Sequence, residues 1–244
     1  MNTQSITAKH PLDLSIGTLL LSLKRWLEMF EVNPKYFPNK GWLEYKLSQQ
    51  DLNHLNKSIK NKTKQMKHAL AGNISKSYTL EDKDNWFFKN VLQLCIAKYI
   101  EEFTGAIIPA VLTKNCAYSL NKLWVNFQKK YEFNPIHDHS GVFSFVIWMK
   151  IPSSFKKECR LPFVKDASQK SPNTFQFLFS DSLGHISTFD YPLEPSNEGT
   201  MLFFPSRLNH TVYPFYSSNK ERISISGNIN LNPEEIINDP YHSV

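Results

Sequence analysis

The chain has 244 residues, of which 41% are hydrophobic and 14% aromatic, including 18 phenylalanines. This apolar content excludes an intrinsically disordered chain and is enough for the core of one large domain. The net charge of +6 is modest for this length, so nucleic acid is a possible partner that the charge does not favour. Three cysteines without a CxxC pair indicate neither a disulfide framework nor a zinc ribbon, and they fit a reducing cytoplasm. The apolar run at residues 16–23 is too short to cross a membrane and lacks the basic start of a signal peptide.

The N-terminal part of the chain has the pattern of a mainly helical region. A helical pattern covers residues 14–30, before the first prolines. Residues 51–70 show the clearest helix, with Asp51 placed to cap it and one apolar stripe made by Leu52, Leu55, Ile59, Met66 and Leu70. A further helix at residues 82–103 is apolar on almost every side, so we expect it to pack against a sheet as a buttress.

After Gly105 the sequence changes to short runs of β-branched and aromatic residues separated by Pro, Asn, Ser and Gly, which indicates strands. We expect strands at residues 118–128, 142–151, 174–179, 186–189, 200–204, 210–213 and 222–230. Residues 152–173 form a long basic loop, which we expect to border the entrance for a substrate, because long loops in compact domains commonly cover a site. Asn232 and Pro233 are typical of a helix start.

Helices followed by a run of strands favour one α+β domain whose core is a sandwich or jelly roll. We therefore expect a single domain over residues 1–244. Its mainly helical part is predicted at residues 1–115, its β core at 116–231 and a C-terminal tail at 232–244.

Two histidines at alternate positions, His137 and His139, stand just ahead of a long apolar strand. Successive side chains of an extended strand point to opposite faces, so these imidazoles share a face and Asp138 points away from it. His210 follows a proline-containing turn much later in the chain. Two ligands from one strand and one from a remote strand are typical of an open catalytic metal site. The alternative is that all three are ordinary polar residues at strand ends.

Arg222 and Ser224 form a second pair at alternate positions. A guanidinium and a hydroxyl on one face of a strand are suited to bind a small carboxylate. An arginine that faces into a β core needs an anion to offset its burial. Glu221 cannot supply it, because its side chain points to the opposite face.

The order of these motifs resembles the iron(II) and 2-oxoglutarate-dependent oxygenases, whose core is a double-stranded β-helix, a cupin-like jelly roll. The resemblance covers residues 116–230 and is closest to oxygenases found in bacteria and frequently in marine bacteriophages. It is carried by Asn134-Pro135-x-His137-x-His139-x-Gly141, Ser144-Phe145-Val146, the Phe-Pro-Ser run that ends at His210, and Arg222-Ile-Ser-Ile-Ser-Gly-Asn228.

The resemblance implies an Fe(II) ion held by His137, His139 and His210, with 2-oxoglutarate and O2 as co-substrates. It also implies that Arg222 pairs with the 5-carboxylate of 2-oxoglutarate and that Ser224 donates a hydrogen bond to it. Most of the superfamily has an aspartate where this chain has His139. Three neutral imidazoles leave a metal more positively charged than a carboxylate would, so a metal other than iron is an alternative.

Asn126 and Trp148 stand on neighbouring strands and are candidates for lining the same pocket. Asn126 is equally well explained as an ordinary strand residue, and Trp148 as an aromatic residue of the core. Pocket and core positions face the same interior of a β-helix, so the sequence does not separate the two explanations.

The resulting prediction is a non-haem iron dioxygenase of the cytoplasm, or of the host cytoplasm if a phage encodes it. It would couple oxidative decarboxylation of 2-oxoglutarate to hydroxylation of an unidentified protein side chain or small molecule. One alternative is a catalytically silent β-helix or cupin-like binding module. Another is a three-histidine dioxygenase without 2-oxoglutarate, in which Arg222 and Ser224 would have no anion to hold.

Overall fold

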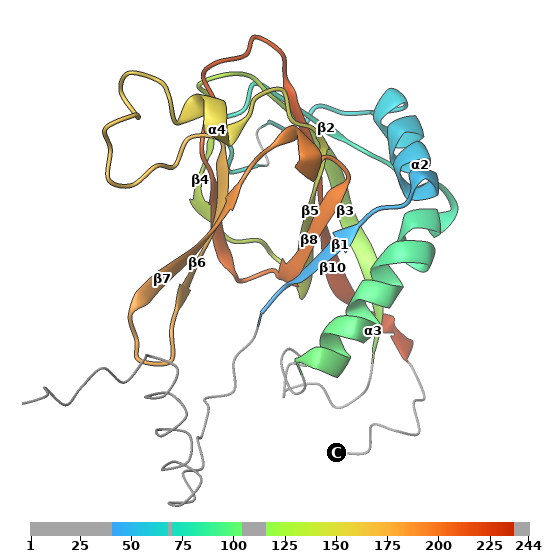
Figure 1. Cartoon of the computed structure of the whole chain (residues 1–244). Coiled ribbons are helices and arrows are strands. Elements are labelled where there is room, and N and C mark those ends of the chain that lie inside the picture. Colours follow the sequence, from blue (N-terminus) through green and yellow to red (C-terminus); the bar gives the residue numbers. More distant parts are fainter. Residues whose placement is uncertain (1–40, 68–69, 104–115, 237–244) are drawn as a thin grey trace, which may run out of the picture. The chain divides into compact units, whose positions relative to one another are not determined.

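Two antiparallel sheets form the framework of the computed structural model, which describes residues 41–67, 70–103 and 116–236 (Figure 1). The strands are β1 (Leu43–Lys46), β2 (Lys76–Thr79), β3 (Cys116–Gln128), β4 (Asn134–His137), β5 (Phe143–Lys150), β6 (Thr174–Ser180), β7 (Ile186–Pro192), β8 (Thr200–Pro205), β9 (Asn209–Val212) and β10 (Arg222–Ile236). The helical elements are α2 (Gln49–Lys60), the 3-10 turns η2 (Lys83–Asn85) and η4 (Pro195–Asn197), the π-helical turn η3 (Phe88–Leu92), α3 (Gln93–Glu102) and α4 (Phe155–Glu158).

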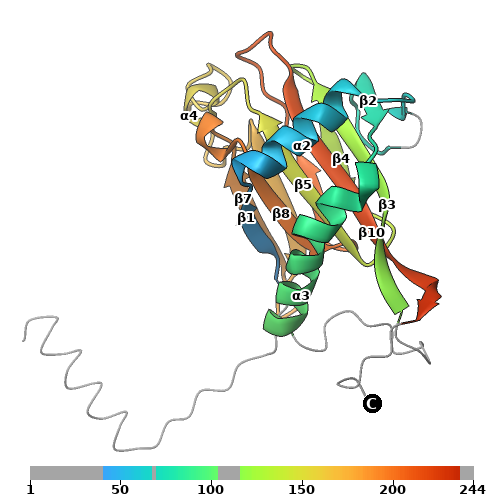
Figure 2. The ribbon, with the colours of Figure 1, turned by 90° about the vertical axis from the view of Figure 1, so that its right-hand side faces the viewer.

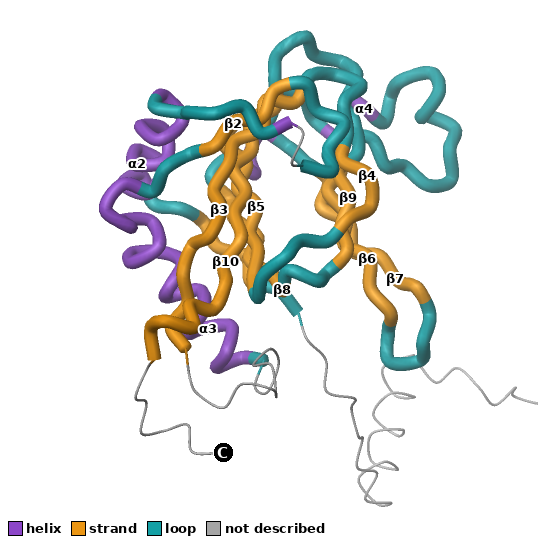
Figure 3. Tube along the Cα trace, turned by 180° about the vertical axis from the view of Figure 1, so that it is seen from behind, coloured by secondary structure: helices purple, strands orange, loops and turns teal. Residues whose placement is uncertain are grey.

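The strand order is that of a double-stranded β-helix. The larger sheet runs β1-β8-β5-β10-β3-β2 and the smaller one β4-β9-β6-β7. From β3 to β10 the chain supplies four strands to each sheet, and it crosses between the sheets repeatedly, as in a jelly roll. The two sheets appear as separate layers in Figure 3. The predicted fold is therefore confirmed.

Helices α2 and α3 cover the outer face of the larger sheet, as expected of a buttress (Figure 2). Phe87 packs against Phe145 with ring centroids 5.9 Å apart, and Tyr99 of α3 packs against Phe143 at 5.1 Å. Leu55 of α2 is fully buried in the same apolar cluster. Burial of such large side chains contributes about 1.5–3 kcal/mol each, so this layer fixes the outer side of the sheet that carries the site.

A second apolar cluster lies between the two sheets. Trp148 of β5 and Phe204 of β8 project from the larger sheet, and Phe175 of β6 meets them from the smaller one. The Trp148 and Phe175 rings lie edge to face with centroids 5.7 Å apart, a favourable geometry for aromatic pairs. This cluster holds the inner faces of the sheets at a fixed spacing beside the site.

The helix expected at residues 51–70 is shorter than predicted. Ser48, rather than Asp51, is the N-cap: its hydroxyl accepts from the Asp51 amide, and its own amide donates to the Asp51 carboxylate in a capping box. The helix ends at Lys60, because the following segment pairs with β2: the amides of Thr63 and Met66 donate to Thr79 and Ser77. This long-range strand pairing outweighs the helical pattern of a lysine-rich segment.

The C-terminal helix start expected at Asn232 and Pro233 is also wrong. Strand β10 continues through both residues and pairs with β3 as far as Ile236, so residues 232–236 are not a free tail. The register shifts between Asn232 and Ile236, and such a bulge accommodates a proline, which has no N–H for the ladder. The short strands β1 and β2 were not predicted, so the region before residue 116 is less purely helical than expected.

Some predictions lie outside the described residues. The helix expected at residues 14–30 is one, and the single domain over residues 1–244 stays a prediction. All described residues belong to one compact unit, residues 39–244. Among them, no helix is long and apolar enough to span a membrane.

The segment at residues 152–173 is anchored rather than loose. Its short helix α4 ends on Glu158, which is fully buried. The Glu158 carboxylate accepts hydrogen bonds from the hydroxyls of Ser153 and Ser217 and from the backbone amides of Tyr216 and Ser217. Burial alone would raise the pKa of this carboxyl. The hydrogen bonds lower the pKa by more than burial raises it, so the pKa lies below its ordinary value. An ionised Glu158 therefore ties this segment to the loop before β10.

Candidate active site

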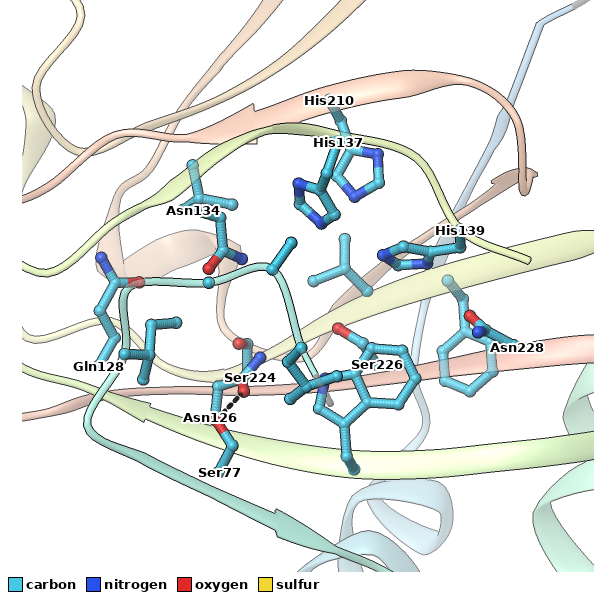
Figure 4. Close-up of a pocket in the computed structure, with 18 of the residues that line it drawn as sticks. Ser77, Asn126, Gln128, Asn134, His137, His139, His210, Ser224, Ser226 and Asn228 are labelled. Carbon is cyan, nitrogen blue, oxygen red and sulfur yellow. Dashed lines mark hydrogen bonds between the residues drawn. The ribbon is translucent and has the colours of Figure 1, made fainter. Parts of the chain in front are cut away.

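Three histidines meet where β4 and β9 pair. His137 is the last residue of β4 and lies directly opposite His210 of β9 in the antiparallel register. His139 follows β4, and its backbone amide donates to the Ser206 carbonyl at 2.8 Å. The ring centroids lie 4.3 Å apart for His137 and His210, 4.9 Å for His139 and His210, and 5.1 Å for His137 and His139. Figure 4 shows the three imidazoles converging on one side of a cavity.

A glycine turn brings His139 into this cluster. Gly141 has a φ of +105°, and a Cβ there would lie 2.7 Å from the Ile229 carbonyl oxygen, so only glycine fits without a shift. Asp138 is not part of the cluster: its carboxylate bonds to Arg207 at 3.1 Å, and both side chains are solvent-exposed. The predicted alternation, with two histidines inward and the aspartate away from them, is thus what the structure shows.

Each imidazole presents its Nε2 atom because Nδ1 carries the proton. His137 Nδ1 lies 2.8 Å from the Pro135 carbonyl and His210 Nδ1 lies 2.9 Å from the Leu208 carbonyl. A carbonyl can only accept, so both Nδ1 atoms must donate. His139 Nδ1 lies 2.9 Å from the Ser144 hydroxyl, which itself donates to Asn228 Oδ1, so this nitrogen also donates. All three tautomers therefore leave an Nε2 lone pair for a metal.

Burial keeps the three histidines neutral. It lowers the pKa of His139 to about 4, with help from the neighbouring His137. The pKa of His210 is held well below its ordinary range, first by burial and then by the other two histidines. The pKa of His137 is lowered by burial, although Pro135 and Asp138 oppose the shift. One ligand atom from each residue lies within 4.8 Å of the others, and neutral imidazole nitrogens are suitable ligands for Fe, Zn, Cu or Ni.

The cavity beside the histidines has a volume of about 260 Å³ and extends along the inner face of the larger sheet. Alternate residues of β10 line it, facing alternate residues of β3: Arg222 opposite Gln128, Ser224 opposite Asn126, and Ser226 opposite Trp124. Figure 4 shows Gln128 at the end away from His139, with Asn126 and Ser224 between them. The cavity therefore has the three histidines at one end and Arg222 at the other.

Arg222 is 1% exposed, and its hydrogen-bond partners among the described residues are all neutral groups. Its Nε donates to Gln128 Oε1 at 3.1 Å, Nη1 to Asn173 Oδ1 at 3.0 Å, and Nη2 to the Tyr213 carbonyl at 2.9 Å. Burial lowers its pKa to about 9, and the charge of Glu158 opposes this shift. The guanidinium is therefore cationic at neutral pH, and no acid in the described part of the chain neutralises its positive charge by direct contact.

The structure brings the predicted site residues together. Asn126, Trp148 and Ser224 line the cavity with the three histidines and Arg222, although Trp148 also belongs to the core between the sheets. None of residues 152–173 lines this cavity, although Asn173 at the end of the segment bonds to Arg222, and the expected place of this loop at a substrate entrance stays a prediction. The wall is completed instead by residues from the segment after α2: Met66, Leu70, Ala71, Gly72 and Ile74.

Four residues that support His139 or Arg222 were not predicted from the sequence. Ser144 and Asn228 bond to each other behind His139, and Gln128 and Asn173 bond to Arg222. The alternation that singles out Arg222 and Ser224 extends to Asn228, and the one through Asn126 extends to Gln128, so both could have been found. Asn173 follows an irregular segment, and no local pattern points to it.

In one cavity of a jelly roll, three convergent histidines form a candidate metal site and a buried arginine forms a candidate anion site. A family model described as "Putative 2OG-Fe(II) oxygenase" matches residues 122–228, which contain all of these side chains. Residues 122–228 thus match the model of a 2OG-Fe(II) oxygenase family, and the resemblance seen in the motifs is confirmed over that region. The cofactors of the family are Fe(II), 2-oxoglutarate and O2, and the three-histidine cluster fits an iron site.

Several solved structures are distantly similar. A prolyl-4-hydroxylase of Pseudomonas putida is 13% identical, with a TM-score of 0.44 over 80% of this chain and 94% of that one. An oxidoreductase of the 2OG-Fe(II) oxygenase family from Burkholderia pseudomallei is 12% identical, with a TM-score of 0.42 over 78% and 85%. The α-ketoglutarate-dependent epimerase SnoN of nogalamycin biosynthesis is 13% identical, with a TM-score of 0.46 over 86% and 82%. No curated protein matches the sequence.

Proposed function

We propose that this chain is a 2-oxoglutarate-dependent dioxygenase that hydroxylates a second substrate. In this proposal His137, His139 and His210 hold Fe(II) through their Nε2 atoms. Arg222 pairs with the 5-carboxylate of 2-oxoglutarate, and Ser224 donates a hydrogen bond to it. When bound, the iron supplies the oxidative chemistry that couples decarboxylation of 2-oxoglutarate to oxidation of the second substrate.

The observation that carries this proposal is the pairing of two complementary groups in one cavity. Three neutral imidazoles at one end favour a cation, and a buried arginine with neutral partners at the other end favours an anion. A dicarboxylate that touches a metal with one end and Arg222 with the other satisfies both. This combination also speaks against a three-histidine dioxygenase without 2-oxoglutarate, because such an enzyme leaves Arg222 without a ligand.

The protein side chains contribute binding and orientation. Carbonyls and the Ser144 hydroxyl fix the Nδ1 protons, so the three rings do not need to change tautomer when a metal binds. Trp148, Phe175 and Phe204 form an apolar wall that restricts water in the cavity. Asn126 accepts a hydrogen bond from Ser77 at 2.7 Å, and this fixes its amide so that the NH2 group is available to a ligand.

The second substrate is proposed to be a small molecule or one protruding side chain of a protein. The cavity volume of about 260 Å³ must accommodate the co-substrate as well, and this leaves room for a small reacting group only. A metal other than iron remains compatible with three imidazoles, and metal analysis of the purified protein distinguishes the two cases.

Anaerobic titration of the iron-loaded protein with 2-oxoglutarate tests the proposal. Chelation of Fe(II) by the 1-carboxylate and the 2-oxo group should give a metal-to-ligand charge-transfer band that saturates with added 2-oxoglutarate. Succinate lacks the 2-oxo group and should compete without producing the band. If the protein binds iron but develops no band, the assignment fails and a binding module without this chemistry takes its place.

A further inference from the structure

Two side-chain amides hold the guanidinium of Arg222 from different parts of the chain. Gln128 ends β3 and is 3% exposed, and Asn173 precedes β6 and is fully buried. Gln128 Oε1 accepts from Nε at 3.1 Å, and Asn173 Oδ1 accepts from Nη1 at 3.0 Å. Neither residue is one of the charged partners that a buried arginine usually has.

The orientation of both amides is fixed by backbone carbonyls. The NH2 group of Asn173 donates to the carbonyls of Ser153 and Leu193, at 2.9 and 2.7 Å. The NH2 group of Gln128 donates to the Glu132 carbonyl. Because a carbonyl cannot donate, rotating either amide would place oxygen against oxygen and NH2 against the guanidinium. Each amide oxygen is therefore required to face Arg222.

The backbone at Asn173 adds to this constraint. Its φ is +54°, in the left-handed region that Asn and Asp adopt more readily than other residues with side chains. Its amide donates to the Pro214 carbonyl and its carbonyl accepts from the Leu193 amide, so the main chain is held on both sides. The side chain thus reaches Arg222 from a rigid position.

The use of amides has a consequence for charge. A glutamate or aspartate at these positions would accept the same hydrogen bonds from Arg222, but it would also neutralise the guanidinium. The three hydrogen bonds to Gln128, Asn173 and Tyr213 occupy three of the five N–H groups of an arginine, and two remain for a ligand as far as the described residues are concerned. Two N–H groups are what a carboxylate accepts in a bidentate pair.

We propose that Gln128 and Asn173 are positioning residues that fix Arg222 in the cavity while leaving its charge available to the distal carboxylate of 2-oxoglutarate. The inference rests on the proposed function. It goes further by assigning a role to two residues that do not touch the metal ligands, and by giving the reason why they are amides and not acids.

A pair of variants separates charge from packing. Gln128→Glu keeps an oxygen acceptor for Arg222 and adds a negative charge, whereas Gln128→Met removes the acceptor and adds no charge. We expect the dissociation constant of 2-oxoglutarate, measured from the anaerobic charge-transfer band of the iron-loaded protein, to rise at least thirty-fold for Gln128→Glu and only several-fold for Gln128→Met. A purely structural role predicts the reverse order, because Gln128→Met loses the contact altogether. Gln49→Glu, which adds the same charge to the exposed start of α2, is the control.

A second variant and a second readout cover the case in which Gln128→Glu does not fold. Asn173→Asp makes the same change on the other side of Arg222, at a φ that aspartate also tolerates. The melting temperature of each metal-free protein is measured with and without glutarate, a dicarboxylate without the 2-oxo group. Glutarate should raise the melting temperature of the wild type and of Gln128→Met, and leave that of Asn173→Asp unchanged.

The outcomes distinguish this inference from the proposed function. If glutarate protects the wild type but not Asn173→Asp, and 2-oxoglutarate gives no band, the role of the amides stands and the oxygenase assignment fails. If Gln128→Glu and Asn173→Asp bind 2-oxoglutarate as well as the wild type, the role of the amides is overturned and the oxygenase assignment stands. If no carboxylate protects the wild type, both are overturned.

Discussion

The imidazole of His139 donates from Nδ1 to the hydroxyl of Ser144, 2.9 Å away, and that hydroxyl donates in turn to Asn228 Oδ1 at 3.0 Å. This relay joins a proposed metal ligand to strands β5 and β10. It fixes both the tautomer and the orientation of a residue that lies outside any strand, since His139 follows the end of β4. His137 and His210 obtain the same result from backbone carbonyls, which mutation cannot remove.

Ser144→Ala should weaken iron binding by about ten- to a hundred-fold, the usual effect of removing the hydrogen-bond partner of a ligating histidine. Competition with a chelator of known affinity measures it. Ser180→Ala, at the exposed end of β6, should leave the affinity unchanged. Equal iron affinity in Ser144→Ala and the wild type would show that the relay does not position His139.

His137→Ala and His139→Ala should each lose most of their iron during dialysis, because each removes one of three proposed ligands. Asp138→Asn should keep it, since the Asp138 carboxylate bonds to Arg207 outside the cluster. Metal analysis of the dialysed proteins gives the result. Loss of iron in Asp138→Asn, with retention in His139→Ala, would mean that the aspartate and not the histidine is the ligand.

Arg222→Leu should weaken 2-oxoglutarate binding by about 2–5 kcal/mol, which is the range for removing one partner of a buried charge pair and corresponds to about thirty- to five-thousand-fold. The charge-transfer titration measures the change. Iron should be retained, because the histidines lie at the other end of the cavity. The melting temperature shows whether the variant is folded, and a folded variant with unchanged affinity for 2-oxoglutarate contradicts the proposed role.

Glu158 should make stability depend on pH in the acidic range. Its folded-state pKa is lower than the ordinary value of 4.5, so its ionised form stabilises the fold above that pH, and this contribution is lost as the pH falls through the folded-state pKa. Glu158→Gln should lower the free energy of unfolding by about 1.5–3 kcal/mol at pH 7, through loss of a hydrogen bond to a charged group. In urea unfolding, the difference between wild type and variant should be constant above pH 5 and shrink below about 4.5. A difference that grows on acidification would contradict this account.

Local alternation explains why much of the site could be predicted. His137 and His139, and likewise Arg222 and Ser224, are two positions apart, and extended backbone places both members of each pair on one face whatever the rest of the fold does. The strand boundaries followed from short runs such as residues 174–179, where β-branched and aromatic residues stop at polar turns.

The predictions that were wrong or missing concern features that depend on contacts between distant segments. Residues 62–67 have a helical composition, but their amides find acceptors on β2, which no local pattern indicates. Pro233 looks like a helix start until the bulge opposite β3 is known. Asn173 reaches Arg222 across 49 positions of sequence, so its role becomes visible only after both chain segments are placed.

If Arg222 binds the co-substrate as proposed, its setting also links co-substrate binding to completion of the fold. Its hydrogen-bond partners come from β3, from the residue before β6 and from the loop before β10. Arg222 is therefore held in place only when three separate stretches of chain have come together. An incompletely folded chain does not hold Arg222 in place, and 2-oxoglutarate should therefore bind the native state alone. By mass action, a ligand at a hundred times its dissociation constant then stabilises the native state by about 2.7 kcal/mol. The supply of 2-oxoglutarate would thereby influence how much folded enzyme survives, as well as how fast it works.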